Sequence, residues 1–227
     1  MSAVRRFVRS NSLTLVFFGI FLAALIGQSV TGLAEYNQQQ LVDGADPISY
    51  LHFVTSSAFA VDVAENWQSE YLQFFLYILG TIWLVQVGSP ESKKPEQIGR
   101  ESDKDQKVGR YALQNSPRWA KVGGWRGWVY ARSLGMLMGL LFLLSLLAQS
   151  VAGTAANNAE RIRQLQVPQS WATYAGSPDF WNRTLQNWQS EFLAVASMVV
   201  FSIYLRERGS PESKPVGAPH SATGVEG

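Results

Sequence analysis

Two carboxylates stand inside apolar stretches that carry no other charge, Glu70 in residues 66–87 and Glu191 in residues 187–205. Ionisable side chains inside membrane-crossing segments are costly, and by default they mark functional positions. Two facing carboxylates can share a proton or hold a cation, because like charges at close range disfavour joint ionisation. With the polar side chains expected at a similar depth, the candidate polar site comprises Gln28, Asn66, Ser69, Glu70, Gln149, Asn187, Ser190 and Glu191.

Two interpretations of this polar cluster remain open. In the structural one, Asn, Gln, Ser and Glu form a hydrogen-bonded layer that fixes helix pairing, each bond contributing about 0.6–2 kcal/mol in a membrane. In the functional one, Glu70 and Glu191 carry a proton or a cation. Trp67 and Trp188 follow the two asparagines directly, and tryptophan is enriched at the membrane–water interface. The cluster is therefore expected near the outer interface.

Other kinds of chemistry lack their residues in this chain. The sequence has no cysteine, and its two histidines, His52 and His220, lie outside the apolar stretches. These counts exclude thiolate sites and intramembrane histidine ligation. No phosphate loop or paired Ser/His/Asp set is present, so we expect no enzyme activity, no catalytic residue, no metal and no cofactor. A net charge of +2 is too small to indicate nucleic-acid binding.

The elements that must position these residues are four apolar helices. Charged residues make up 16% of the chain, against about 25% in an ordinary soluble domain. A membrane-crossing helix needs roughly 20 mainly apolar residues. Stretches of that length at 13–33, 66–87, 134–153 and 187–205 predict an all-α polytopic membrane protein with four transmembrane helices.

The distribution of positive charge predicts the orientation of these helices. Of the 19 Lys and Arg residues, 16 lie before the first span, between the second and third spans, or after the fourth. Because Lys and Arg collect in cytoplasmic loops, both termini are expected in the cytoplasm. A signal peptide at the N-terminus is disfavoured, since the third span repeats the first in mid-chain.

The chain is an internal duplication with a constant offset of 121 residues. Aligning 12–93 on 133–214 without a gap gives 29 identities in 82 positions. Two copies that each cross the membrane twice point the same way, which predicts tandem parallel hairpins related by an axis along the membrane normal. The expected parts are a first repeat at 1–93, a flexible linker at 94–118, an interfacial segment and second repeat at 119–214, and a disordered tail at 215–227.

Three motifs of the duplication carry a resemblance to a known family. They are Gln-Ser-Val-x-Gly at 28 and 149, Asn-Trp-Gln-Ser-Glu at 66 and 187, and Gly-Ser-Pro-Glu-Ser-Lys at 88 and 209. In these motifs the chain resembles an uncharacterised bacterial four-helix membrane family of unknown function. The resemblance implies the four-span fold and the bacterial inner membrane, and it implies no activity.

Boundary residues indicate where the helices begin and end. Gly44 is expected to stop the first long helix, and Ser56 and Ser177 are expected to cap the return helices. Gly88 and Gly209, each followed by a proline two residues later, are expected to end the second and fourth helices. Among basic residues at the inner surface, the interfacial tryptophans Trp119, Trp125 and Trp128 suit a segment lying on anionic lipid.

The leading functional expectation is a small, non-enzymatic membrane protein of the bacterial inner membrane that binds a partner or lipid. Its expected partners are membrane lipids, with another membrane protein or a small ion as further candidates. The alternative is an ion- or proton-coupled transporter that uses Glu70 and Glu191.

Overall fold

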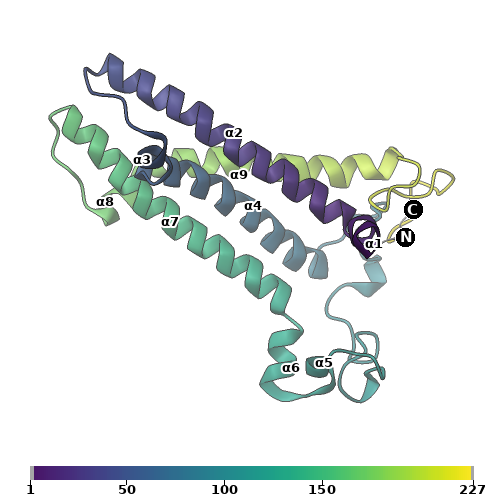
Figure 1. The fold of residues 1–227 in the computed structure, drawn as a ribbon. Coiled ribbons are helices and arrows are strands. Elements are labelled where there is room, and N and C mark those ends of the chain that lie inside the picture. The colour runs from purple at the N-terminus through teal and green to yellow at the C-terminus, as the bar shows by residue number, and fades with distance from the viewer. Residues whose placement is uncertain (1–2, 226–227) are drawn as a thin grey trace. The chain divides into compact units, whose positions relative to one another are not determined.

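The computed structural model describes residues 3–225, which contain nine α-helices, two 3₁₀ turns and no strand (Figure 1). The all-α prediction is confirmed for these residues. The helices are α1 (Ala3–Ser10), α2 (Ser12–Val42), α3 (Tyr50–Val54), α4 (Ser57–Trp83), α5 (Arg118–Lys121), α6 (Gly124–Tyr130), α7 (Ser133–Arg163), α8 (Trp171–Ala175) and α9 (Pro178–Tyr204), and the turns are η1 (Pro95–Gln97) and η2 (Gly109–Tyr111).

The 121-residue offset is preserved in the helix boundaries. The pairs α2 and α7, α3 and α8, and α4 and α9 each begin and end 121 residues apart. The caps also repeat, since Ser56 accepts the Phe59 N–H at 3.2 Å and Ser177 accepts the Phe180 N–H at 3.3 Å. The predicted caps of both return helices are therefore confirmed, and the duplication extends from sequence to secondary structure.

Two of the predicted spans lie in helices that are long and apolar enough to cross a membrane. Among the described residues these are α2 and α7, and α4 and α9 do not reach the same apolarity. Both of the latter are 27 residues long, but the Asn-Trp-Gln-Ser-Glu motif occupies the middle of each. Of the four predicted transmembrane helices, two are thus candidate membrane spans by length and apolarity.

The described chain divides into two compact units, each built from two separate stretches of the sequence. The first holds residues up to Val63 together with Ala152–Pro168, and the second holds Ala64–Val151 and the residues from Gln169 onward. The boundary cuts through α4 and α7, so each unit draws on both copies of the duplication. The boundaries of the compact units therefore differ from the boundaries of the sequence repeat.

In the first unit, α3 and the loop before it fold back on α2. The Asn37 side chain donates to the Ile48 carbonyl at 3.0 Å and accepts from the Ile48 N–H at 2.8 Å, which satisfies both backbone groups of one loop residue. The Phe53 ring packs against Gly32, where an added Cβ would lie 3.0 Å from the ring. The predicted stop is confirmed, since α2 ends at Val42 and Gly44 follows with φ of 72°.

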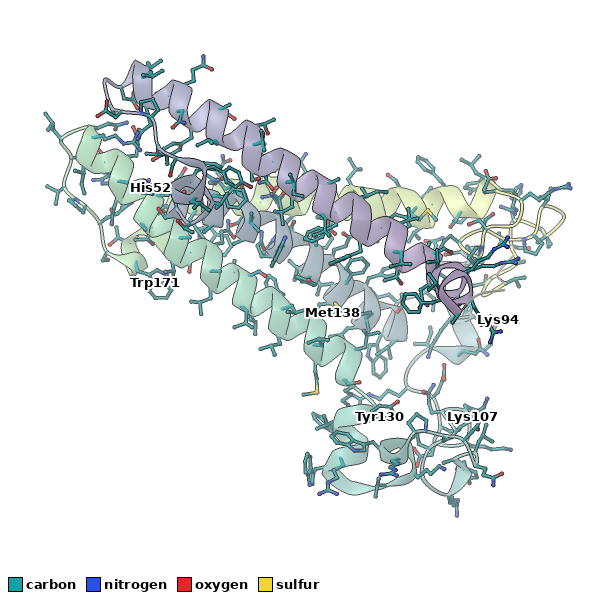
Figure 2. All side chains as sticks on the ribbon, viewed as in Figure 1. His52, Lys94, Lys107, Tyr130, Met138 and Trp171 are labelled. Carbon is teal, nitrogen blue, oxygen red and sulfur yellow. The ribbon has the colours of Figure 1, made fainter. Side chains whose placement is uncertain are left out.

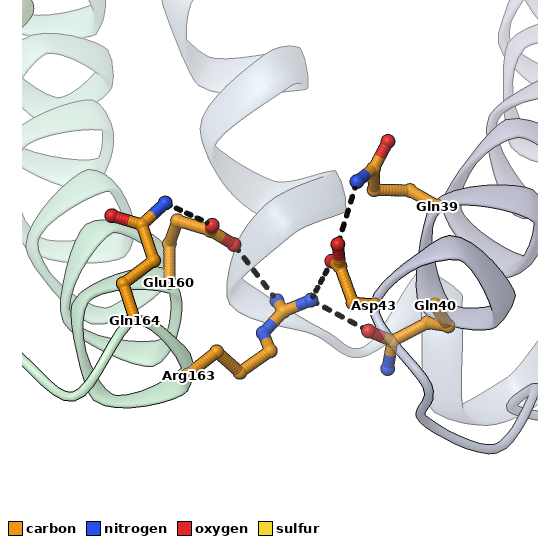
Figure 3. A network of polar contacts seen from close by, with 6 residues as sticks. All are labelled: Gln39, Gln40, Asp43, Glu160, Arg163 and Gln164. Atoms are coloured by element: carbon orange, nitrogen blue, oxygen red, sulfur yellow. Dashed lines mark hydrogen bonds and ion pairs between the residues drawn. The ribbon is translucent and has the colours of Figure 1, made fainter.

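The C-terminal ends of α2 and α7 meet in a polar network within the first unit (Figure 3). Arg163 donates to the Gln40 side-chain oxygen at 2.6 Å and lies 3.4 Å from the Asp43 carboxylate. Glu160 lies 3.6 Å from the same guanidinium. The first copy has Val42 at the position equivalent to Arg163, so this ion pair joins the copies where they differ.

In the second unit, α4 is packed between antiparallel α7 and parallel α9. Phe75 lies 2.9 Å from a Cβ placed on Gly139, and Leu79 lies 3.5 Å from one placed on Gly135, so contacts run in opposite directions along α4 and α7. Glycine permits this close approach because it has no side chain.

In the contacts between α4 and α9, the residue numbers of both helices instead increase in the same direction. Glu65 binds Arg183 at 2.7 Å, and Gln68 binds Trp188 at 2.8 Å. The second helices of the two copies therefore run in the same direction through this unit, as parallel repeats require.

The predicted ends of the second and fourth helices are wrong by several residues. The helix α4 ends at Trp83 and α9 at Tyr204, and the glycines expected to end them, Gly88 (φ 91°) and Gly209 (φ 87°), lie in the loops beyond. In each loop the second motif serine accepts a backbone N–H, Ser92 from Gln86 at 2.8 Å and Ser213 from Glu207 at 3.0 Å. The serine bridge closes the loop, and the glycine supplies its left-handed residue.

Residues 215–225 of the predicted disordered tail are held in place by hydrogen bonds within the second unit. The buried Lys214 ammonium donates to the carbonyls of Gly88, Pro219, His220 and Ala222, at 2.5, 3.4, 2.9 and 3.2 Å. Residues 226–227 lie outside the described part of the chain.

The tail also bonds to the loop that follows α4 and holds the first Gly-Ser-Pro-Glu-Ser-Lys motif, residues 88–93, here called the first motif loop. The Thr223 hydroxyl accepts the Gly88 N–H at 2.8 Å, and the Gly224 N–H donates to the Ser89 carbonyl at 3.1 Å. Gly88 leaves room for this contact, because a Cβ there would lie 2.5 Å from the His220 carbonyl oxygen.

Candidate functional site

The α4–α9 interface brings together several residues of the candidate polar site. The Glu191 carboxylate on α9 lies close enough to α4 for Ser69 and the negative charge of Glu70 to act on it electrostatically. Ser69 is buried, Glu191 is half-buried and Glu70 is exposed. The two glutamates thus lie within electrostatic range of each other on neighbouring helices.

The remaining members of the Asn-Trp-Gln-Ser-Glu motifs are used differently in the two copies. In the first, the fully buried Gln68 accepts the Trp188 indole N–H and donates to the Glu65 carbonyl at 3.1 Å. Ser69 and Ser190 each donate to a backbone carbonyl of their own helix, that of Asn66 and that of Asn187, both at 2.9 Å. Ser190 is exposed, unlike its buried counterpart Ser69.

Gln149 pairs with a hydroxyl instead of a glutamate. Its amide nitrogen donates to the Thr184 hydroxyl at 3.2 Å, and its carbonyl oxygen is buried without a hydrogen bond among residues 3–225. The first copy has Val63 at the position of Thr184, so Gln28 has no equivalent hydroxyl on its own return helix. Gln28 lies half-buried on α2, in the first unit.

The serine that follows each of these glutamines anchors a short helix. Ser29 lies 2.8 Å from the Tyr50 hydroxyl, and Ser150 accepts the Trp171 indole N–H at 3.0 Å. Trp171 begins the short helix α8 (Figure 2). In the Gln-Ser-Val-x-Gly motif, the serine therefore has a structural use in both copies.

Sequence reasoning missed the ion pair between Glu65 and Arg183 and the buried Tyr174 beside it. Burial, together with the negative charge of Asp179, raises the pKa of Tyr174 to about 12. The sequence feature that could have indicated this ion pair is a difference between the two copies. The second copy has Arg183 where the first has Asp62, and Gln186 where the first has Glu65. Such departures mark places where the two copies contact each other.

The interfacial tryptophans of the linker lie on two short helices. The first residue of α6, Gly124, has φ of 70°, a conformation that ends α5 and starts a new helix. Trp119, Trp125 and Trp128 are 45%, 68% and 53% exposed. Guanidinium groups stack on two of them, that of Arg126 on Trp125 at 5.5 Å and that of Arg132 on Trp128 at 4.7 Å. Tyr130 ends the second of these helices (Figure 2).

No group of three or more His, Asp or Glu side chains in residues 3–225 is arranged to hold a metal ion. The chemistry available to the described site is therefore that of two neighbouring carboxylates with hydroxyl and amide partners.

Over the described residues, these features define an all-helical fold with two helices long and apolar enough to cross a membrane, and a duplicated polar motif. The chain belongs to the family described as Domain of unknown function (DUF6766), which it matches over residues 4–225. No curated protein and no solved structure matches the chain.

Proposed function

We propose that this chain is a non-enzymatic integral protein of the bacterial inner membrane that binds lipid or a membrane partner. The observation that carries the proposal is the exposure of its most apolar helices. Only 6% of the apolar window of α2 and 17% of that of α7 is buried within the protein. A core helix of a soluble protein is mostly buried, whereas a helix in hydrocarbon meets no such requirement.

In this proposal α4 and α9 are the second and fourth spans of a four-helix bundle. Each has 27 residues and a length of about 40 Å at 1.5 Å per residue, enough to cross a bilayer. Their parallel course supports two hairpins that enter and leave the membrane alike, related by a two-fold axis along the membrane normal. Both termini are then cytoplasmic, as the positive charges predict.

The segment from α5 to α6 is the inner-surface contact of the proposed membrane protein. These two helices lie within residues 106–132, which contain six basic residues and no acidic one. The tryptophans of the two helices are exposed. Anionic lipid attracts such a segment with about 1 kcal/mol for each basic residue near the surface.

Single cysteines test this proposal cleanly, because the chain has none of its own. Asp46→Cys and Val167→Cys, at exposed positions, should react in intact cells with a membrane-impermeant maleimide. Lys104→Cys should react only after the cells are opened. Labelling of position 104 in intact cells, or recovery of the chain without detergent, would overturn the proposal.

Ion- or proton-coupled transport by Glu70 and Glu191 is the second candidate. It is favoured by the electrostatic contact between the two carboxylates across α4 and α9. In this candidate the charge is the essential property, so replacement of each glutamate by glutamine is the deciding change.

A further inference from the structure

A groove of about 280 Å³ lies between α4, α9 and the first motif loop, entirely within the second unit. On α4 its wall runs from Gln73 through Tyr77 and Gly80, at the three- and four-residue spacing of one helix face, and Leu84 continues it just beyond the helix end. This face is about 16 Å long at 1.5 Å per residue. On α9 the wall is formed by Phe192, Val195 and Val199. The groove is thus elongated along the helices.

The side walls of the groove are hydrocarbon, although several lining residues are polar. The Thr81 hydroxyl donates to the Tyr77 carbonyl at 2.9 Å, and the Ser92 hydroxyl accepts from Gln86 and donates to the Lys93 carbonyl. The hydroxyl groups of Thr81 and Ser92 are therefore already hydrogen-bonded within the protein. A ligand that fills the length of the groove must therefore be apolar along most of its own length.

The end of the groove at the motif loop is acidic. The Tyr77 hydroxyl donates to the Glu91 carboxylate, and the negative charge of Glu212, from the second motif, also acts on this hydroxyl. The lysine of each motif is engaged elsewhere. Lys93 binds Glu101 and the Gly99 carbonyl, both at 3.0 Å, and Lys214 is buried among carbonyls. The negative charge at this end of the groove is therefore that of Glu91, which is part of its wall.

We propose that this groove binds an amphiphile with a single hydrocarbon chain and a cationic ammonium head group. The chain lies along the α4–α9 face, and the ammonium lies against Glu91, where an anionic head group is repelled. The inference rests on the proposed function, since α4 and α9 present the groove to the membrane interior where such amphiphiles partition.

Among the described residues, the second copy lacks the side chains that form this groove in the first. At the positions equivalent to Gln73, Tyr77 and Gly80, the second copy has Ala194, Met198 and Phe201. It lacks both the tyrosine that faces the carboxylate and the glycine that opens the wall. The expected stoichiometry is one amphiphile per chain.

Native mass spectrometry of the full chain in a neutral detergent tests the proposal, with dodecyltrimethylammonium as probe and dodecanoate as its anionic match. We expect one bound dodecyltrimethylammonium per chain and no comparable binding of dodecanoate. Glu91→Gln removes the charge partner, and Val195→Phe fills the wall, so each should weaken binding about tenfold.

Matched controls are Glu96→Gln, an exposed acid of the linker, and Leu193→Phe, on an exposed face of α9. Both should bind as the unchanged chain does. Equal binding of the two probes, no binding of either, or unchanged binding by both Glu91→Gln and Val195→Phe would overturn the proposal. The head-group comparison needs no variant, so a folding defect cannot produce a false result. Failure of the cysteine-labelling test alone would reject the membrane topology and leave the binding result standing.

Discussion

At the scale of single residues, the glutamate pair is where the structural and functional interpretations give different outcomes. Glu→Gln keeps the shape and hydrogen-bonding capacity of the side chain, while Glu→Ala removes both. If the layer is structural, Glu70→Gln and Glu191→Gln should unfold at unchanged temperature, and Glu191→Ala should lose stability because the polar side chains of the layer lose a partner. This cost should be about 1–3 kcal/mol.

Thermal unfolding in detergent and rescue of a deletion strain decide between the two. Gln variants that fold normally but fail to rescue would support transport. Gln variants that are both stable and fully able to rescue would remove it.

Gln149 and Thr184 form a buried pair whose partners can be removed separately. Thr184→Val keeps the shape of the side chain but leaves the Gln149 amide without an acceptor, which should cost about 1–3 kcal/mol. Adding Gln149→Leu to Thr184→Val should recover part of this loss, because it also removes the buried unbonded carbonyl oxygen. Chemical denaturation of the two single variants and the double variant measures the coupling. Strictly additive losses would contradict the pairing.

At the scale of elements, the connection between α8 and α9 should respond to alkaline pH through Tyr174. Burial and the charge of Asp179 raise its pKa from 10.0 to about 12. Because the folded value exceeds the unfolded one, the contribution of the neutral phenol is complete below about pH 10 and is lost as pH rises through 12.

Stability measured between pH 9 and 12 should therefore fall more steeply for the natural chain than for Tyr174→Phe. The first copy has Phe53 at the equivalent position, which indicates that the ring alone fits such a site. Identical pH profiles would show that Tyr174 does not titrate differently on folding.

The ordered tail is an element that depends on one buried lysine. Lys214→Met removes the ammonium that four carbonyls share, so residues 215–225 should detach and become sensitive to protease. Lys93→Met is the matched control, because Lys93 holds the equivalent motif position but binds Glu101 at the surface. Hydrogen exchange of the tail amides should rise in the first variant alone. A rise in both would mean that the motif, and not Lys214, holds the tail.

What the sequence predicted at this scale followed from local physics. Helix caps at Ser56 and Ser177 and the stop at Gly44 depend on neighbouring residues and appear as expected. The early end of α4 depends on the bridge from Ser92 to Gln86, six residues apart, which no helix-stop pattern contains. The order of the tail depends on a lysine reaching Gly88, 126 positions away in the sequence.

The candidate site shows the same division between local and long-range information. Repetition of Asn-Trp-Gln-Ser-Glu predicted that Glu70 and Glu191 would lie near each other, and the two carboxylates lie within electrostatic range. Their functional role stays a prediction. The repetition did not predict that Gln149 would pair with Thr184, because the first copy has Val63 at that position, or that Gln68 would bind Trp188, because this pair joins unlike positions of the two copies. An exact repeat has no information about contacts that break its own symmetry.

At the scale of the whole molecule, the duplication predicts a rotation of about 180° about the membrane normal. A two-fold axis exchanges each residue with its equivalent 121 positions away. The distance between a residue of the first copy and one of the second therefore equals the distance between their two equivalents. Spin labels at Asp46→Cys and Leu205→Cys form one pair, and labels at Val167→Cys and Leu84→Cys form the exchanged pair. All four positions are exposed, and the chain contributes no cysteine of its own.

Pulsed electron–electron double resonance should give the same mean distance for both pairs, to within the uncertainty that the flexible linkers of the spin labels add. Asp46 and Val167 should also share one side of the membrane, with Leu84 and Leu205 on the other, because each pair of equivalents is related by the same axis. Both distances should therefore be of transmembrane length, since a bilayer core is about 30 Å thick. Unequal distances, or one short and one long, would show that the two hairpins are not related by this axis, and the parallel-repeat arrangement would have to be given up.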